Sequence, residues 1–294
     1  MVCGLGHGGD SSYYFNKEGK MSDKALTLDM ASELNKQLAR KNATIELTQK
    51  NLITNQANLD RLAELILGKS EVTVDGVITV YGVKYYHHSN GGGLVAETAK
   101  VAETAYVGPF ALVKDEAQVL DKARIEDRAV ISEKAIIKEK AQVSGSAQVS
   151  GSARVYGSAQ VFGSAQVSGS ALVSGSARVF DSAEVCGLAR VYGSALVSGS
   201  ARVFGSAEVC GLARVYGSAR VSGSARVFDS ARVCDLARVY GLARVYGSAE
   251  VSGSAQVFGS AQVSGSALVY GSARVSGSAR ITEGCYYSEE KFKG

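Results

Sequence analysis

Proline is almost absent from this sequence: Pro109 is the only one in 294 residues, against 34 glycines. The chain is therefore not proline-rich low-complexity material, although it is highly repetitive. No apolar run approaches the roughly 18 residues that a membrane-spanning helix needs, and we recognise no secretory signal segment. We expect a protein with no membrane span that is cytoplasmic in the producing cell or part of a virion or appendage.

Cysteine is scarce too, and neither sign of charge dominates. Five cysteines with no C-x-x-C pair favour a reduced compartment over a disulfide framework. The net charge of +4 at pH 7 is too small a bias to indicate nucleic acid as a partner. We therefore expect neither a disulfide scaffold nor a nucleic-acid-binding protein.

Residues 93–284 contain a six-residue unit that recurs in 32 hexads without insertion or deletion. The unit reads Ala, variable, Val, variable, then usually Gly-Ser, as in AQVSGS and ARVYGS. Its third position is always Val or Ile, and its first is Ala in every hexad except the one that starts at Gly93. A fixed short period predicts a solenoid, and a hexapeptide period predicts a parallel β-helix.

The residues of a single hexad explain this prediction. Alternation over the first four positions turns Ala and Val inward and the two variable residues outward, as in a short strand. Gly at position five allows a corner with positive φ, and Ser at position six favours turn hydrogen bonds. One hexad buries one Val, worth about 1.5 to 3 kcal/mol, against roughly 1 to 2 kcal/mol of backbone entropy per residue. Only stacked coils can therefore be stable.

These residues resemble the hexapeptide-repeat superfamily of left-handed parallel β-helices, whose founding members are trimeric bacterial acyltransferases. The resemblance covers about two-thirds of the chain, and the spelling GSARVYGSAQV is similar to near-perfect arrays from bacterial and phage genomes. It implies three hexads per triangular coil and a left-handed path. Ten to eleven coils at about 4.8 Å each would make a rod of roughly 50 Å.

The acyltransferase activity that the resemblance implies needs a histidine base on a coil and a loop that shapes the acceptor pocket. The only histidines are His7, His87 and His88, and none lies in the repeat, which no loop interrupts. His87 and His88 are weak candidates for a base or for metal ligands. No acidic or cysteine ligand lies nearby at suitable spacing, so we interpret both as rim residues of a cap. We expect no catalytic residue, metal site or cofactor.

The segments that precede the repeat lack its pattern. Residues 1–20 predict an unstructured leader, and we hypothesise that native translation starts at Met21. Residues 21–68 predict an α-helical stem that forms a coiled coil, because one apolar column recurs at every seventh position. The column, which would mediate oligomerisation, consists of Leu38, Ile45, Leu52, Leu59 and Ile66. Its companion column is mostly polar, so a lone amphipathic helix packed on the rod is the alternative.

Residues 69–92 predict a connector with a β-hairpin. Two β-branched runs flank Asp75-Gly76, which is a strong signal for a two-residue turn. The hairpin would cap the solenoid, since an open end exposes unpaired backbone groups. Residues 285–294 form a charged and aromatic C-terminal tail. The predicted fold is therefore mainly β, a left-handed parallel β-helix over residues 93–284 that follows a helical stem and a hairpin cap.

The outward positions supply the candidates for binding. Position two carries mainly Arg and Gln, and position four alternates Ser with Tyr or Phe. Arginine with interleaved aromatics can bind a glycan, a single-stranded nucleic acid or a protein. The candidate surface-binding residues are Arg154, Tyr156, Phe162, Arg178, Phe180, Arg190 and Tyr192. Such residues should scatter over all three faces, so we interpret them first as packing along the ladders or between subunits, and a dedicated binding groove is the alternative.

Three cysteines recur within a longer unit. Cys186, Cys210 and Cys234 are spaced by four hexads. If a coil contains three hexads, that step climbs one coil and moves on by one face. We therefore expect the three thiols on three different faces, where they cannot form one site.

We interpret the chain as a structural or adhesive homo-oligomer, a trimer, in which the β-helix acts as a spacer and display rod, as in a phage tail fibre. Its partners would be a cell-surface glycan or protein, or other virion proteins. One alternative is a hexapeptide-type acyl or sugar-modifying transferase, and another is a scaffold that polymerises by end-to-end stacking. Only the transferase needs a base and a pocket, and the sequence offers neither.

Overall fold

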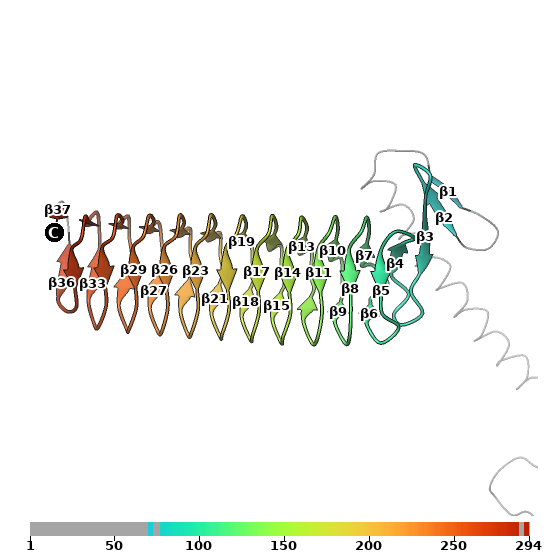
Figure 1. Cartoon of the computed structure of the whole chain (residues 1–294), viewed down its shortest axis with the longest axis horizontal. Coiled ribbons are helices and arrows are strands. Elements are labelled where there is room, and N and C mark those ends of the chain that lie inside the picture. The colour runs from blue at the N-terminus through green and yellow to red at the C-terminus, as the bar shows by residue number, and fades with distance from the viewer. Residues whose placement is uncertain (1–69, 73–76, 288–290, 294) are drawn as a thin grey trace, which may run out of the picture. The chain divides into compact units, whose positions relative to one another are not determined.

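The computed structural model describes residues 70–72, 77–287 and 291–293. The predicted leader and helical stem, with the five residues of the heptad column, lie outside the described residues. Every regular element in the described part of the chain is a β-strand. The hexad pattern therefore yields the mainly β solenoid that it predicts, and Figure 1 shows its coils following one another in a row.

The strands form three sheets, which we call face 1, face 2 and face 3. Face 1 contains, in spatial order, β1 (Ser70–Val72), β2 (Ile78–Val80), β3 (Val83–His87), β4 (Leu94–Ala96), β7 (Leu112–Val113), β10 (Val130–Ile131), β13 (Gln148–Val149), β16 (Gln166–Val167), β19 (Glu184–Val185), β22 (Arg202–Val203), β25 (Arg220–Val221), β28 (Arg238–Val239), β31 (Gln256–Val257), β34 (Arg274–Ser276) and β37 (Lys291–Lys293).

Faces 2 and 3 have 11 strands each. Face 2 contains β5 (Lys100–Val101), β8 (Gln118–Val119), β11 (Ile136–Ile137), β14 (Arg154–Val155), β17 (Leu172–Val173), β20 (Arg190–Val191), β23 (Glu208–Val209), β26 (Arg226–Val227), β29 (Arg244–Val245), β32 (Gln262–Val263) and β35 (Arg280–Ile281). Face 3 contains β6 (Tyr106–Val107), β9 (Arg124–Ile125), β12 (Gln142–Val143), β15 (Gln160–Val161), β18 (Arg178–Val179), β21 (Leu196–Val197), β24 (Arg214–Val215), β27 (Arg232–Val233), β30 (Glu250–Val251), β33 (Leu268–Tyr270) and β36 (Cys285–Tyr287).

The register confirms that three hexads make one coil. Each strand from β4 to β32 pairs in parallel with the strand three hexads further on, as Val143 does with Val161. Backbone bonds join the coils at both strand and corner: Gln142 N–H donates to the Ala159 carbonyl at 2.9 Å, and Ser146 N–H donates to the Gly163 carbonyl at 2.7 Å. The result is a parallel β-solenoid of about eleven coils.

The core consists of the first and third positions of the hexads. From Ala117 to Val275, every residue at these positions is fully buried, with 0% of its surface exposed. The predicted inward direction of Ala and Val is therefore confirmed. A continuous column of such side chains stabilises each coil only through its neighbours, because one hexad buries too little apolar surface by itself.

Each corner is a tight turn of four residues. In the turn after β12, Ala147 N–H donates to the Ser144 carbonyl at 3.4 Å, and Gly145 has a φ of +69° while Ser146 does not have a positive φ. A positive φ at the second residue alone is the pattern of a type II′ turn. Because this turn begins at position four, the strands are two residues long at most places, shorter than the four alternating residues of the hexad suggest.

The chain enters the solenoid through antiparallel strands. β1 pairs with β2, β2 with β3 and β3 with β4, after which all pairing is parallel. The predicted pairing of the segments on either side of Asp75-Gly76 is present. Its register differs from the prediction, however: Val72 lies opposite Ile78, whereas a two-residue turn would place Val72 opposite Thr79. The turn itself, residues 73–76, lies outside the described residues.

The predicted C-terminal tail continues the solenoid. β36 adds a strand to face 3 and β37 adds one to face 1. Their register steps are one residue shorter than three hexads, since Leu268 pairs with Cys285 and Arg274 pairs with Lys291. One residue fewer in the connection keeps the rungs aligned after the hexad pattern has ended.

Candidate functional site

The seven candidate surface-binding residues lie on two faces and do not form one cluster. Face 2 carries Arg154, Tyr156, Arg190 and Tyr192, and face 3 carries Phe162, Arg178 and Phe180. The outward Arg and aromatic residues as a class do occur on all three faces, since Arg202 and Phe204 belong to face 1, but these seven occupy two of them. The reason lies in their spacing, because six hexads separate Arg154 from Arg190 and two whole coils return the chain to the same face.

On face 3 the aromatic residues pack along the ladder. The rings of Phe162 and Phe180 stack with centroids 4.9 Å apart and an interplanar angle of 2°. The Arg178 guanidinium lies 5.2 Å from the Phe162 centroid and 5.5 Å from that of Phe180. Cation–π contacts of this kind hold the charge close to the rod. These residues are engaged with one another, which supports the interpretation of ladder packing.

A shallow groove of about 370 Å³ brings together two of the predicted arginines on face 2. It is lined by Ser152, Arg154, Ser170, Leu172, Leu188, Arg190, Ser206 and Glu208. Position-two residues form one wall and position-six residues form the other, so the groove follows from the three-hexad register. Glu208 lies 3.7 Å from Arg190 and 2.8 Å from Arg226, so part of the positive charge is neutralised within the protein. The groove offers hydrogen bonds and apolar contact.

Four exposed leucines occupy corner positions that sequence reasoning passed over. Leu188, Leu212, Leu236 and Leu242 stand where most hexads have Ser, and each is between 61% and 63% exposed. The departure from Gly-Ser at position six was the available signal. Since Leu188 lines the groove on face 2, these residues add apolar contact to an otherwise polar corner surface.

His87 and His88 lie at the entrance to the solenoid. His87 Nδ1 is 2.7 Å from the Gly92 carbonyl oxygen, and His88 Nδ1 is 3.1 Å from the carbonyl oxygen of Asn90. Within the described residues, no group of three or more His, Cys, Asp and Glu side chains is arranged to hold a metal ion. The ring nitrogens thus contribute to the local loop.

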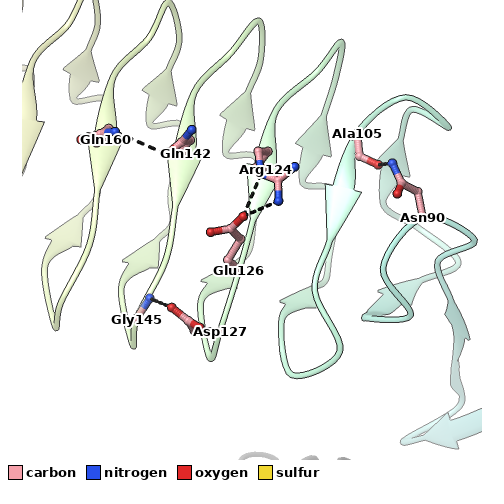
Figure 2. A network of polar contacts seen from close by, with 8 residues as sticks. All are labelled: Asn90, Ala105, Arg124, Glu126, Asp127, Gln142, Gly145 and Gln160. Atoms are coloured by element: carbon pink, nitrogen blue, oxygen red, sulfur yellow. Dashed lines mark hydrogen bonds and ion pairs between the residues drawn. The ribbon is translucent and has the colours of Figure 1, made fainter.

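The loop beside these histidines covers the first strand of face 3. Asn90 Nδ2 donates to the Ala105 carbonyl at 2.9 Å (Figure 2), and Val107 N–H donates to the Asn90 carbonyl at 3.0 Å. Gly93 N–H donates to the Val107 carbonyl at 2.9 Å. The loop therefore satisfies backbone groups that an open sheet edge would leave unpaired.

The three repeated cysteines lie on three faces, as predicted. Cys186 follows β19 on face 1, Cys210 follows β23 on face 2 and Cys234 follows β27 on face 3. All three are free thiols. Burial raises the pKa of the Cys186 and Cys234 thiols, which keeps them protonated and poorly nucleophilic at neutral pH.

Tyrosines lie beside two of these thiols. Tyr216 forms a side-chain hydrogen bond with Cys234, and this bond, together with burial, raises the pKa of Tyr216 to about 12. Tyr192 is related to Cys210 in the same way, and its pKa is also raised. Because each pair is one coil apart on the same face, it ties neighbouring coils together.

Comparison with known proteins supports the solenoid. A family model described as YdcK beta solenoid repeat matches residues 147–163 and 261–277. Each match spans nearly one coil, and together they cover a small part of the chain. No curated protein matches the sequence. Among the described residues, no helix is long and apolar enough to cross a membrane.

Proposed function

We propose that the chain is a non-enzymatic structural rod, which acts as a spacer and display surface in a homotrimeric assembly such as a phage tail fibre or a cell appendage. The proposal includes membership of the hexapeptide-repeat superfamily and the left-handed path that this resemblance implies. A cell-surface glycan, a cell-surface protein or other virion proteins would be the partners. The coiled coil of residues 21–68 would join the three chains.

One observation supports the rod more than any other. From Ala117 to Val275 the buried positions repeat without a single interruption, and no coil in this stretch departs from the three-hexad register to shape an acceptor pocket. An enzyme of this architecture would need such a departure beside a base. A uniform rod needs only length, stiffness and a regular surface, and about eleven coils at about 4.8 Å each give a length of roughly 50 Å.

The trimer is tested through the heptad column. Replacing Ile45 and Leu52 with Asp puts charges into the apolar seam, which should cost several kcal/mol per layer and release monomers. The matched control replaces Lys50 and Ala57, which stand five residues after Ile45 and Leu52 and would lie on the outer side of the coiled coil, with Asp and should keep the trimer. Light scattering measures the mass. A wild-type mass equal to one chain would contradict the proposed trimer, while the solenoid would stand.

The non-enzymatic part is tested separately. A double variant, His87→Ala with His88→Ala, should fold normally and bind any partner as the parent does. Assays for acyl transfer to amine and hydroxyl acceptors should give no turnover with either protein. Transfer by the parent that is lost in the double variant would overturn the proposal in favour of a transferase.

A further inference from the structure

A belt of arginines surrounds the solenoid near its C-terminal third. Six successive hexads, residues 213–248, carry Arg at position two, so two neighbouring coils have arginine on every face. We call these six residues the arginine belt: Arg214, Arg220, Arg226, Arg232, Arg238 and Arg244. All six are exposed. The stretch also contains two Asp, which leaves a net charge of +4, as large as that of the whole chain.

The belt places like charges in direct register. On face 1, Arg220 stands next to Arg238 in the adjacent strand, and Arg202 stands on the other side of Arg220 in the same row. Faces 2 and 3 have the pairs Arg226 with Arg244 and Arg214 with Arg232. Like charges directly opposite each other in a ladder destabilise the sheet.

The fold does not require these arginines. The six hexads of residues 141–176, which lie upstream of the belt, contain one Arg and no acidic residue. There Gln142 and Gln160 occupy the same positions of the ladder and share a side-chain hydrogen bond of 3.3 Å (Figure 2). The arginines therefore add repulsion that the solenoid can do without, which points to a function at the surface.

Most of the positive charge in the belt is not neutralised by the protein. Arg226 pairs with Glu208 at 2.8 Å, and Arg232 lies 3.7 Å from Glu250. Within the described part of the chain, Arg214, Arg220, Arg238 and Arg244 form no ion pair. The two acidic residues of the stretch, Asp229 and Asp235, accept hydrogen bonds from backbone N–H groups at the corners of the next coil, those of Gly247 and Gly253.

Two belt arginines line a hollow on face 3. The hollow measures about 300 Å³ and is bounded by Leu196, Ser198, Arg214, Tyr216 and Arg232. Its volume lies at the lower end of the range for small-ligand sites, which suits one sugar unit. Two guanidinium groups match a carboxylate or sulfate, the Ser198 hydroxyl matches a sugar hydroxyl, and the leucine and tyrosine side chains match the apolar face of a sugar ring.

Nucleic acid fits this surface less well than an acidic sugar does. Bases bind single-strand sites by stacking on exposed aromatic rings. Around the belt, the rings of Phe228 and Tyr246 already stack on each other at 4.9 Å, and those of Tyr240 and Phe258 stack at 5.0 Å. Their faces are directed at neighbouring coils, and Tyr216 in the hollow is one ring rather than a row on which successive bases could stack, so the acid groups favour an acidic sugar over a base.

We infer that the arginine belt is a binding site for an acidic polysaccharide. One acidic sugar unit would occupy the hollow between Arg214 and Arg232, and other acid groups of the polymer would contact the remaining arginines. Arginine rungs about 4.8 Å apart suit a polymer with repeated charges. This inference goes beyond the rod function, and it holds for a single chain as well as for a trimer. If the polysaccharide did not bind, the mass and length that the rod function predicts would still hold.

The test compares two double variants that remove the same charge. One replaces Arg214 and Arg232 with Gln, and the control replaces Arg274 and Arg280, which are exposed and outside the belt, with Gln. Gln is the natural residue at other position-two sites, so both variants should fold, and the belt variant should melt no lower than the parent because it loses a repelling pair. Binding is measured by titration with polygalacturonate at low and at moderate salt, with neutral dextran as the uncharged polymer.

The full-length parent should bind polygalacturonate and not dextran, with an affinity that falls as salt rises. The belt variant should bind at least about tenfold more weakly, and the control should change by less than about threefold. Equal losses in the two variants would overturn the site, since they would show general charge attraction only. Tighter binding of single-stranded poly(dT) or polyglutamate than of polygalacturonate would overturn the ligand class, as would the absence of binding at low salt.

Discussion

The Asp127 carboxylate accepts a hydrogen bond of 2.9 Å from the backbone N–H of Gly145, the residue at the same corner of the next coil (Figure 2). Asp127 has a φ of +52°, in the left-handed region that most corners fill with glycine. The same kind of bond is accepted at other corners by Asp115, Asp121, Glu139, Asp181, Asp229 and Asp235. These carboxylates connect coils at the corner.

Substitution of Asp127 should separate this bond from backbone strain. Asp127→Ala loses the acceptor and keeps the left-handed conformation, and we expect it to lower the free energy of unfolding by about 1 to 2 kcal/mol. Asp127→Gly loses the same acceptor but relieves strain of similar size, so it should be nearly neutral. In both variants the Gly145 amide should exchange its hydrogen faster. The amide of Gly163 serves as the control, because the corner one coil before it is Gly145, which has no side chain to accept a bond. Unchanged exchange at Gly145 would refute the bond from Gly145 to Asp127.

Glycine-to-alanine substitutions should depend on the space at each corner. Gly151 and Gly241 have similar φ values of +71° and +74°, so the backbone strain of alanine is about equal, roughly 1 to 2 kcal/mol. A Cβ on Gly151 would lie 2.5 Å from the Gly169 carbonyl oxygen, whereas on Gly241 its nearest contact would be at 3.1 Å. Gly151→Ala should therefore melt at a lower temperature than Gly241→Ala. Identical melting temperatures would show that the coils separate to admit the methyl group.

Deletions should be tolerated in whole coils. Removing Ala141 to Ser158 joins Lys140 to Ala159 in the same hexad phase and on the same face, so each inward Val still stacks on a Val. The Asp127 carboxylate would then meet the corner amide of Gly163. We expect the rod to shorten by about 4.8 Å with little loss of stability, as measured by small-angle scattering and thermal unfolding.

Shorter deletions provide the contrast. Removing four residues breaks the hexad phase and loses about 1.5 to 3 kcal/mol at each Val that is displaced from the core. Removing one hexad keeps the hexad phase but moves every later hexad to the neighbouring face. The protein should still fold, but it should no longer bind a partner that contacts residues on one face both before and after the deletion. If the four-residue deletion and the whole-coil deletion melted at the same temperature, the three-hexad coil would be wrong.

Tyr216 should make stability depend on alkaline pH. Its hydrogen bond with Cys234 and its burial raise its pKa from an ordinary 10.0 to about 12. The folded protein therefore holds the phenol proton more tightly than the unfolded chain. The resulting stabilisation is complete below pH 10 and is lost as the pH rises through about 12.

The measurement is a difference titration. Phenolate absorbance of the parent minus that of Tyr216→Phe isolates this residue and should show a midpoint near 12. In a Cys234→Ala background the midpoint should move down towards 10.0, because the partner in the hydrogen bond is gone. A parental midpoint at the ordinary value would contradict the contact.

The regular part of this fold could be predicted because one period determines it. Position one and three residues such as Ala141 and Val143 had to face inward, and the three-hexad coil assigned Cys186, Cys210 and Cys234 to separate faces from their spacing alone. The same arithmetic would have brought Arg154, Leu172 and Arg190 together in the groove on face 2.

Other features depend on geometry that the period does not contain. Asp127 and Glu139 stand where most hexads have glycine. Their positive φ and their hydrogen bonds to the next coil could be recognised only from the structure of the corner. Which arginine Glu208 prefers depends on rotamers, because Arg190 and Arg226 are both one coil away. The register of Val72 with Ile78 is not contained in the Asp75-Gly76 signal, which predicts Val72 opposite Thr79.

The backbone hydrogen bonds between coils run along the rod axis, as the bonds from Gln142 to Ala159 and from Ser146 to Gly163 illustrate. A pull on the two ends of the solenoid loads all bonds of one coil interface together, while successive interfaces carry the same load in series. The tension at which the rod parts is therefore that of its weakest interface. Gain or loss of whole coils would change the reach of the rod and leave its breaking tension the same.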